Sequence, residues 1–474
     1  MTGEPRLLIG GEWVSALSKV PIVNPYDDTV VAEVPVADAE LVERALQAAA
    51  EAKAEMARLP AYRRSEILLK AARLVAERKE ELAATITRET GKTIRNSRQE
   101  IDRSIFTLTV CAEEAGRLAG EEVRLDRVPG SENRMGFVVR QPVGVVACIT
   151  PFNAPFNLIC HKAGPAIAAG NAVIVKPAPQ APLTGLMLGE ILLEAGLPPR
   201  AISVVNGGPD VGRQLVQDPR VNFIAFTGSA RVGQEIARTA GFKKLMLELG
   251  SNAGVYVHSD ARLDKAVPRL VQGAFATTGQ ACISTQRIYV HESLFAAFLE
   301  RFLPAVERLV VGDPMDPATD IGPMIDKAAA ERVEAWIREA EAGMARVLVG
   351  GRRQGATVWP TVLAEVRPDM KVVCEEVFGP VVSVIPVASL EEGLARINDS
   401  AYGLQAGIFT ESIDVAFRAA KELEVGGVIV NDSSKYRVDN MPFGGVKASG
   451  IGRESPADCV ERMTEKKLLV FTLD

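Results

Sequence analysis

Short apolar runs alternate with amphipathic segments along the middle of the chain. The strand-like runs are 143–150 (VGVVACIT), 171–177, 201–207 and 222–229. Between them, helices are indicated at 163–170, at 182–196 with apolar positions three and four apart, and after 230. Gly170 and Gly196 stand where the first two helices should end. Alternating strands and helices predict a parallel, doubly wound α/β sheet whose strands are covered on both faces.

A second set of α/β elements follows residue 251. Residues 260–276 are expected to form a helix, and the strand candidates are 287–293, 345–351, 381–387 and 426–432. The segment 121–142 differs, because its alternation and central Pro-Gly predict two extended strands joined by a turn. The tail 465–473 (EKKLLVFTL) is typical of an edge strand that needs a partner.

Length and composition narrow the class of protein. A chain of 474 residues suggests two or three domains, and 47% hydrophobic with 24% charged residues is ordinary for a globular protein. The net charge of −6 gives no support to nucleic-acid binding. We see no secretory leader and no run of about 18 apolar residues, so we expect a soluble, cytoplasmic protein without a membrane span.

The cysteines and histidines restrict the chemistry. None of the six cysteines forms a CxxC pair, so neither a zinc site nor a disulfide framework is expected; they are Cys111, Cys148, Cys160, Cys282, Cys374 and Cys459. Cys282 stands among small polar residues in TTGQACISTQR (277–287), which is compatible with a nucleophile. A Cys–His hydrolase would need one of only three histidines, His161, His258 and His291, as its base.

Two glycine-containing turns follow predicted strands. They are VVNGGPDVG (204–212) and FTGSARVG (226–233), and each precedes a helix whose free N–H groups would suit a pyrophosphate. Neither has the GxGxxG spacing, so an ordinary strand-to-helix turn is an equal alternative.

Three further motifs carry polar side chains in apolar surroundings. Asn153 in TPFNAPFN could donate to an oxyanion or simply cap a turn. Glu248 in LMLELGSNAG could be a partly desolvated base or a solvent-facing charge. EEVFGP (375–380) could hold a ribose with a carboxylate and set Phe378 against a flat ring, or form a surface turn.

In this order along the chain, the motifs resemble the aldehyde dehydrogenase superfamily. The resemblance runs from GGEWV (10–14) to MPFGGVKASGIGRE (441–454). It implies that Cys282 is the nucleophile, that Asn153 and the Cys282 N–H hold the oxyanion, and that Glu248 activates water. Lys162 matches a family lysine close to the active site. The implied reaction forms a thiohemiacetal and then a thioester on Cys282, and requires no metal.

The resemblance also implies a site for NAD or NADP. Lys176 matches a lysine on the adenine ribose, Glu376 a carboxylate on the nicotinamide ribose, and Phe378 a ring beside the nicotinamide. The full set of expected cofactor residues is Thr150, Pro151, Phe152, Lys176, Pro179, Gly208, Gly212, Phe226, Gly228, Ser229, Val232, Leu249, Glu376 and Phe378.

The implied architecture has three parts. A Rossmann-type cofactor domain would comprise 1–120 and 143–250, and an α/β catalytic domain 251–447. Residues 121–142 and 448–474 would form a small β oligomerisation element, so a homodimer or homotetramer is expected.

Some residues depart from the family's common patterns. NAD-preferring members often carry a glutamate at the position of Pro179, so its absence predicts that NADP is accepted. Arg231 could bind the extra phosphate or be a solvated charge in the first turn of a helix. His161 replaces an arginine typical of succinate-semialdehyde enzymes, which favours the branch of lactaldehyde, short hydroxyaldehyde and semialdehyde dehydrogenases. His161 and Arg437 are the candidate substrate contacts.

Several alternatives remain open from the sequence. The first is a succinate-semialdehyde-type enzyme anchored by Arg437. The second is a CoA-acylating member, which the presence of Glu248 disfavours. The third is a catalytically silent member, although Cys282 and Asn153 are both retained.

Overall fold

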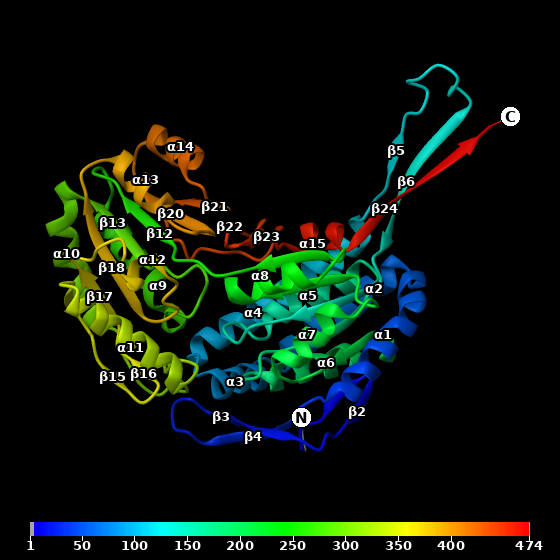
Figure 1. Cartoon of the computed structure of the whole chain (residues 1–474), viewed down its shortest axis with the longest axis horizontal. Helices are drawn as coiled ribbons and strands as arrows, with labels where there is room; N and C mark the ends of the chain where they lie inside the picture. Colours follow the sequence, from blue (N-terminus) through cyan, green and yellow to red (C-terminus); the bar gives the residue numbers. More distant parts are fainter. Residues whose placement is uncertain (1–3, 474) are drawn as a thin grey trace.

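The computed structural model describes residues 4–473 and contains two large sheets that lie side by side, each with its own helices (Figure 1). The first sheet has the order β2-β1-β9-β8-β7-β10-β11-β23, and its five central strands are parallel. Its strands are β1 (Leu7–Ile9), β2 (Glu12–Val14), β7 (Val145–Ile149), β8 (Ala172–Lys176), β9 (Ile202–Val204), β10 (Phe223–Thr227), β11 (Lys244–Glu248) and β23 (Gly450–Ile451). The predicted doubly wound sheet is therefore confirmed, and β7, β8 and β9 are buried throughout because helices cover them.

Nine α-helices accompany this sheet among the described residues. They are α1 (Ala39–Arg58), α2 (Ala61–Glu77), α3 (Lys79–Thr90), α4 (Ile94–Arg117), α5 (Asn157–Ala168), α6 (Pro182–Glu194), α7 (Pro209–Gln217), α8 (Ala230–Thr239) and α15 (Pro456–Arg462), with a 3-10 turn at Pro199–Ala201. α6 begins at Pro182 as predicted but ends at Glu194, two residues before Gly196, which takes a positive φ just past the helix.

α5 starts earlier than the sequence predicted. We expected a helix over 163–170, whereas the structure begins it at Asn157. The cause is a distant cap: Glu100 in α4 accepts hydrogen bonds from the backbone N–H groups of Phe156 (2.9 Å) and Asn157 (3.1 Å). A carboxylate stabilises the positive end of a helix, but this one comes from another helix and leaves no local signal.

The second sheet has the order β14-β17-β18-β13-β12-β20-β21 and is parallel except for β14. Its strands are β12 (Gly254–Val257), β13 (Arg287–His291), β14 (Arg346–Val349), β17 (Thr361–Ala364), β18 (Val381–Val387), β20 (Gln405–Phe409) and β21 (Gly427–Val430). Its helices are α9 (Leu263–Phe275), α10 (Glu292–Glu307), α11 (Lys327–Ala342), α12 (Lys371–Cys374), α13 (Leu390–Asn398) and α14 (Ile413–Glu422). The strands and the helix predicted after residue 251 are present.

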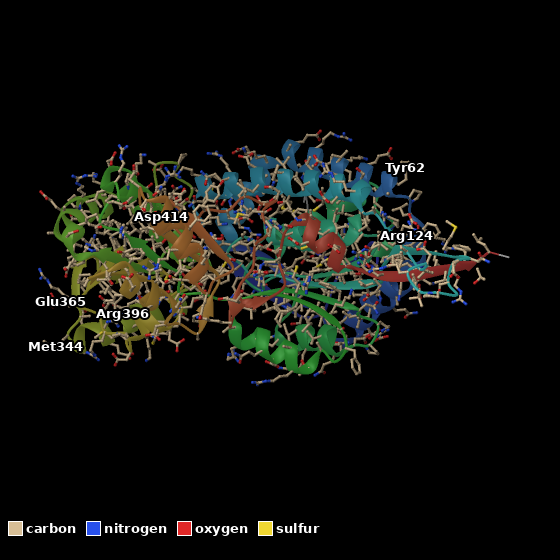
Figure 2. The ribbon with its side chains drawn as sticks, turned by 90° about the horizontal axis from the view of Figure 1, so that it is seen from above. Tyr62, Arg124, Met344, Glu365, Arg396 and Asp414 are labelled. Carbon is tan, nitrogen blue, oxygen red and sulfur yellow. The ribbon has the colours of Figure 1, made fainter. Side chains whose placement is uncertain are left out.

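A three-stranded antiparallel sheet projects away from both bodies, and the chain ends in it (Figure 1). It consists of β5 (Glu121–Val123), β6 (Arg134–Pro142) and β24 (Thr464–Thr472), in the order β24-β6-β5. Figure 2 shows Arg124 near this sheet and Met344 and Glu365 at the opposite end of the molecule. The two extended strands predicted in 121–142 and the strand of the tail are therefore present.

One predicted grouping is corrected. We had placed all of 448–474 with the projecting sheet, but β23 pairs with β11 and α15 contacts α4 and α5. Cys459 in α15 is fully buried in the core of the first body. Only β24 joins the projecting strands, because the apolar face of α15 is buried by the first body. The bounds 1 and 474 lie outside the described residues.

Three short pairs of strands complete the fold. They are β3 (Lys19–Val23) with β4 (Val30–Pro35), β15 (Arg353–Gln354) with β16 (Thr357–Val358), and β19 (Tyr402–Gly403) with β22 (Val446–Lys447). Within residues 4–473, no helix has the length and apolar character needed to cross a membrane.

Candidate active site

A cavity of about 610 Å³ opens at the carboxyl ends of the parallel strands of the first sheet. The strand order β9-β8-β7-β10-β11 reverses direction between β7 and β10, and such switch points are where doubly wound sheets bind ligands. Eleven of the expected cofactor residues line this cavity: Thr150, Pro151, Phe152, Lys176, Pro179, Gly208, Gly212, Phe226, Gly228, Ser229 and Val232. The loops that carry them follow β7, β8, β9 and β10, so the fold brings distant motifs to one edge.

Two features of this cavity suit a phosphorylated ligand. Ser229 caps α8, so the N-terminus of that helix faces the cavity. Burial lowers the pKa of Lys176 to about 8, and its ammonium contacts only the Pro177 carbonyl (3.3 Å) among the described residues. Lys176 thus has donors left for hydroxyl groups.

A second cavity, of about 450 Å³, lies where the two bodies meet. Asn153, Glu248 and Leu249 reach it from the first body, and Cys282, Glu376 and Phe378 from the second. Both cavities share residues Pro151 and Phe152 and the turn 227–229, so they are continuous along that wall. The remaining expected cofactor residues, Leu249, Glu376 and Phe378, line the second cavity together with the nucleophile.

Cys282 is carried on an unusual turn. Thr277 (φ 61°), Thr278 (φ 54°) and Gly279 (φ 67°) are all left-handed, a conformation that is strained for a β-branched residue. The turn is held by hydrogen bonds from Lys435 to the Ala276 carbonyl and from Thr278 to the Gly322 carbonyl (3.2 Å). Gly279 has no room for a side chain, because a Cβ there would lie 2.1 Å from the Gly379 oxygen.

The Cys282 sulfur is in a desolvated position. Burial raises the pKa of its thiol to about 12, while the charge of Arg437 pulls it down. Asn153 lines the same cavity, and its side-chain oxygen has no hydrogen-bond partner within residues 4–473. The Asn153 amide and the Cys282 thiol thus face the same cavity.

Glu248 stands at the end of β11 and is 2% exposed. Neither of its carboxylate oxygens has a hydrogen-bond partner among the described residues. Burial and then the charge of Glu454 raise its pKa well above the usual range, against the opposing charges of Arg437 and Lys162. A carboxyl group with a raised pKa is suited to exchange protons near neutral pH.

Glu454 is the buried counter-ion beneath the site. It is 1% exposed and accepts hydrogen bonds from Lys162 Nζ (2.6 Å) and Arg437 Nη2 (3.0 Å). Burial opposes its charge, but Lys162 and Arg437 outweigh that effect and lower its pKa. Lys162 also donates to Thr227 (2.7 Å). Lys162 itself does not line the cavity, but it pairs with Glu454, which does.

His161 requires a correction. We expected it to contact the substrate, but it is fully buried, is absent from the cavity lining, and faces Asp439 through Nε2 (2.8 Å). Burial lowers its pKa despite the Asp439 hydrogen bond, so it is a neutral donor there. Asp439 also accepts hydrogen bonds from Nε (3.0 Å) and Nη2 (2.6 Å) of Arg103, a residue that lines the cavity. Asp439 thus links the buried His161 to Arg103.

Glu376 and Phe378 line the second cavity. Burial raises the pKa of Glu376 to about 7, and Glu376 Oε1 accepts the Ser251 N–H (2.9 Å). A Cβ on Gly250 would lie 2.4 Å from its other oxygen, so only glycine admits the carboxylate. The Phe378 ring meets Phe152 edge-on at 5.8 Å.

Five charged residues that line the second cavity were not expected from the sequence. They are Lys92, Arg103, Arg332, Lys435 and Glu454. Glu454 ends the motif MPFGGVKASGIGRE and Lys435 precedes Arg437, so their nearness to recognised positions was the available signal. Lys92 and Arg103 come from the N-terminal helical region, more than 170 residues before Cys282 along the chain. No local sequence pattern marked them as site residues.

The comparison with known proteins agrees with this arrangement. The model of the family described as "Aldehyde dehydrogenase family" matches residues 13–469. The chain belongs to the aldehyde dehydrogenase family. It is 48% identical over 468 residues to 3-sulfolactaldehyde dehydrogenase of Priestia aryabhattai, covering 98% of each chain. The resemblance predicted from the motifs is thereby confirmed, and the protein is an oxidoreductase that acts on aldehydes.

Two solved structures share the whole fold of this aldehyde dehydrogenase. Aldehyde dehydrogenase 21 from Physcomitrella patens, in complex with the reaction product succinate, has a TM-score of 0.97 and 39% identity, with 100% of this chain and 99% of that one covered. NADP-dependent glyceraldehyde-3-phosphate dehydrogenase from Bacillus halodurans, complexed with NADP, has a TM-score of 0.97 and 36% identity, with both chains fully covered.

Proposed function

We propose that this aldehyde dehydrogenase oxidises a short hydroxyaldehyde or semialdehyde to its carboxylic acid with NADP or NAD, through a thioester on Cys282. The observation that carries the proposal is the meeting of Asn153, Glu248 and Cys282 in one cavity that continues into the phosphate-binding edge of the first sheet. Relatives named for sulfolactaldehyde and for succinate as product support a short substrate.

The residues present fit a nicotinamide dinucleotide. Gly212 leaves open the approach to Lys176, since a Cβ there would stand 3.7 Å from the lysine stem, and Gly208 has nothing within 4 Å. The buried Thr150 hydroxyl has no partner among the described residues. Lys176 and Glu376 would hold the two riboses, and the α8 N-terminus the pyrophosphate. The bound nicotinamide supplies the hydride acceptor.

The chain's own residues account for the remaining steps. The Cys282 thiol releases its proton to water as the sulfur adds to the aldehyde carbon, and Asn153 with the Cys282 N–H stabilises the oxyanion of the resulting thiohemiacetal. Loss of hydride from that carbon leaves the thioester. Glu248 then removes a proton from water as it attacks, which releases the acid and returns the thiol.

NADP acceptance is part of the proposal. Pro179 and Gln180 line the cofactor cavity and carry no charge to repel a 2′-phosphate. Arg231 lines the same cavity and makes no ion pair within residues 4–473, whereas nearby Arg213 is paired with Asp210 at 2.7 Å. A free guanidinium suits a phosphate, which it can bind with two parallel hydrogen bonds.

Domain division, assembly and location complete the proposal. We retain 1–120 with 143–250 as the cofactor domain, 251–447 as the catalytic domain and the projecting strands as an oligomerisation element. β24 pairs on one side only among the described residues, and Leu468, Val470 and Phe471 are exposed on it, which favours a homodimer or homotetramer. Six free cysteines favour a reducing compartment such as the cytoplasm.

The test is the absorbance of reduced nicotinamide with NAD and NADP offered separately. The aldehydes are lactaldehyde, glyceraldehyde, glycolaldehyde, succinate semialdehyde, 3-sulfolactaldehyde and butanal. We expect oxidation of at least one short polar aldehyde, and its loss in Cys282→Ala with cofactor binding retained. Turnover that survives in Cys282→Ala contradicts the mechanism. Cofactor binding without oxidation of any aldehyde favours a CoA-dependent or a catalytically silent member.

A further inference from the structure

The substrate end of the second cavity is rich in cations. Lys92, Arg103, Lys435 and Arg437 all line it, and three of them have a carboxylate partner. Lys92 pairs with Glu100, Arg103 with Asp439 and Arg437 with Glu454. Lys435 makes no ion pair within residues 4–473. Burying a cation without a counter-ion costs free energy. A bound anion would remove that cost.

Lys435 has a donor to spare. It stands in the loop after β21, and its ammonium donates to the Ala276 carbonyl and to the Thr277 hydroxyl (3.3 Å). An ammonium carries three N–H donors, so one is left. Lys435 also lines a neighbouring cavity of about 300 Å³ that shares Lys92 and Arg103 with the second cavity.

Arg437 offers a second unpaired donor at the same place. Its side chain is 8% exposed, with Nη2 on Glu454 and the guanidinium 3.8 Å from the centre of the Phe443 ring. Its Nε is buried and has no hydrogen-bond partner among the described residues. Lys435, Arg437 and Cys282 line the same cavity, so both cations face the space in which the nucleophile acts.

We propose that Lys435 and Arg437 form an anion subsite that holds a sulfonate or carboxylate at the far end of the aldehyde, and that Lys435 decides the preference for such substrates. The proposal rests on the proposed function, since it names the substrate class of the same site. The third N–H of Lys435 and the Nε–H of Arg437 donate to the anionic oxygens while the carbonyl carbon meets Cys282. Charge-assisted hydrogen bonds are the strong ones in such sites.

The surplus charge could instead serve the reaction itself, by stabilising the thiolate and the oxyanion. These two roles make different predictions. A cation that stabilises the reacting atoms speeds every aldehyde equally, whereas a cation that binds the tail affects only aldehydes that carry an anion. Lys435 also braces the strained turn before Cys282, so its removal can slow all substrates alike for structural reasons.

The experiment therefore compares two substrate pairs of matched length. Succinate semialdehyde is set against butanal, and 3-sulfolactaldehyde against lactaldehyde. In Lys435→Met we expect kcat/KM for the anionic member to fall about ten- to hundredfold more than kcat/KM for the neutral member, mainly through KM. Lys435→Arg should keep the wild-type preference for the anionic member of each pair, because arginine keeps the positive charge. The size of the loss in each pair shows whether sulfonate or carboxylate is the better fit.

A matched control is Lys70→Met. Lys70 also donates to a backbone carbonyl, that of Glu194 (2.7 Å), but lies on α2 and lines neither part of the site. This variant should leave both members of each pair unchanged. Equal losses for anionic and neutral aldehydes in Lys435→Met would overturn the proposal, as would a wild-type enzyme without preference for the anionic member.

A second measurement does not depend on turnover. Methanesulfonate and acetate should slow the alkylation of Cys282 by a neutral reagent in the wild type, and this protection should be lost in Lys435→Met. If no aldehyde is oxidised but protection follows this pattern, the proposed function fails and the anion subsite stands. If neither anion protects the wild type, the subsite is refuted.

Discussion

The exchange of Glu454 for glutamine tests how a buried counter-ion tunes the site. Glu454 holds Lys162 at 2.6 Å and Arg437 at 3.0 Å, and the side chains of all three are at most 8% exposed. Removing one partner of a buried ion pair costs about 3–5 kcal/mol, because the remaining charges stay buried without compensation. We expect Glu454→Gln to lose stability of that order in urea denaturation.

The same exchange should move the pH dependence of thioester hydrolysis. The charge of Glu454 raises the pKa of Glu248, whereas Lys162 and Arg437 lower it. Neutral glutamine leaves the two cations in place, so the pKa of Glu248 falls. Activity that needs ionised Glu248 is present above its pKa and is lost as the pH falls through it. The acid limb of kcat should therefore shift to lower pH in Glu454→Gln.

The assay separates the two steps of the reaction. Stopped-flow absorbance gives a burst of reduced nicotinamide for thioester formation, and the steady-state rate after the burst reports its hydrolysis. In a Glu248→Gln background the shift caused by Glu454→Gln should vanish, since its target is missing. Glu66→Gln is the control for stability, because Glu66 pairs with Arg63 at 2.7 Å on the surface, where a pair contributes about 0–1 kcal/mol. A folded Glu454→Gln enzyme whose acid limb stays in place or moves to higher pH refutes the reasoning.

Three further outcomes follow from the site. Glu248→Gln should leave the burst intact and slow the steady-state rate about 10²–10⁴-fold, the ordinary contribution of a general base; loss of the burst itself would move Glu248 to the first step. Pro179→Glu should raise KM for NADP at least about tenfold and leave KM for NAD nearly unchanged, and equal changes for both cofactors would remove Pro179 from the discrimination. Burial lowers the pKa of Lys435 to about 7. The ratio of kcat/KM for succinate semialdehyde to kcat/KM for butanal should therefore decrease above that pH, because the ammonium loses its proton. Lys435→Arg should make this ratio independent of pH in the same range.

The sequence was most informative where a residue's role depends on its own strand or turn. The four apolar runs of the first sheet became β7 to β10, and eleven expected cofactor residues met at one edge because the carboxyl ends of parallel strands coincide. Cys282, Asn153 and Glu248 were found by motif, and each stands at the end of a strand or in a turn that the motif itself specifies.

The sequence was least informative where charges from distant elements compensate one another. Lys162 and Glu454 are 292 positions apart, and Arg103 and Asp439 are 336 apart, so no local pattern pairs them. His161 shows the consequence. Its neighbours suggested a substrate contact, but the packing of α5 turns it toward Asp439 inside the protein. The same limit concealed Glu100 as the cap of α5.

Arg437 links substrate choice to reactivity. Its charge lowers the pKa of both Cys282 and Glu248, and it is also half of the proposed anion subsite. An anionic tail on Arg437 would offset part of that charge, so both pKa values should rise when such a substrate binds. Glu454 remains in place beneath the guanidinium, and the effect of the tail therefore adds to that of Glu454. An anionic aldehyde thus gains binding at Lys435 and Arg437 but meets a thiol and a carboxyl group that hold their protons more tightly. Consequently the acid limb of kcat should lie at higher pH for succinate semialdehyde than for butanal, and Lys435→Met should leave that difference in place as long as the tail still reaches Arg437.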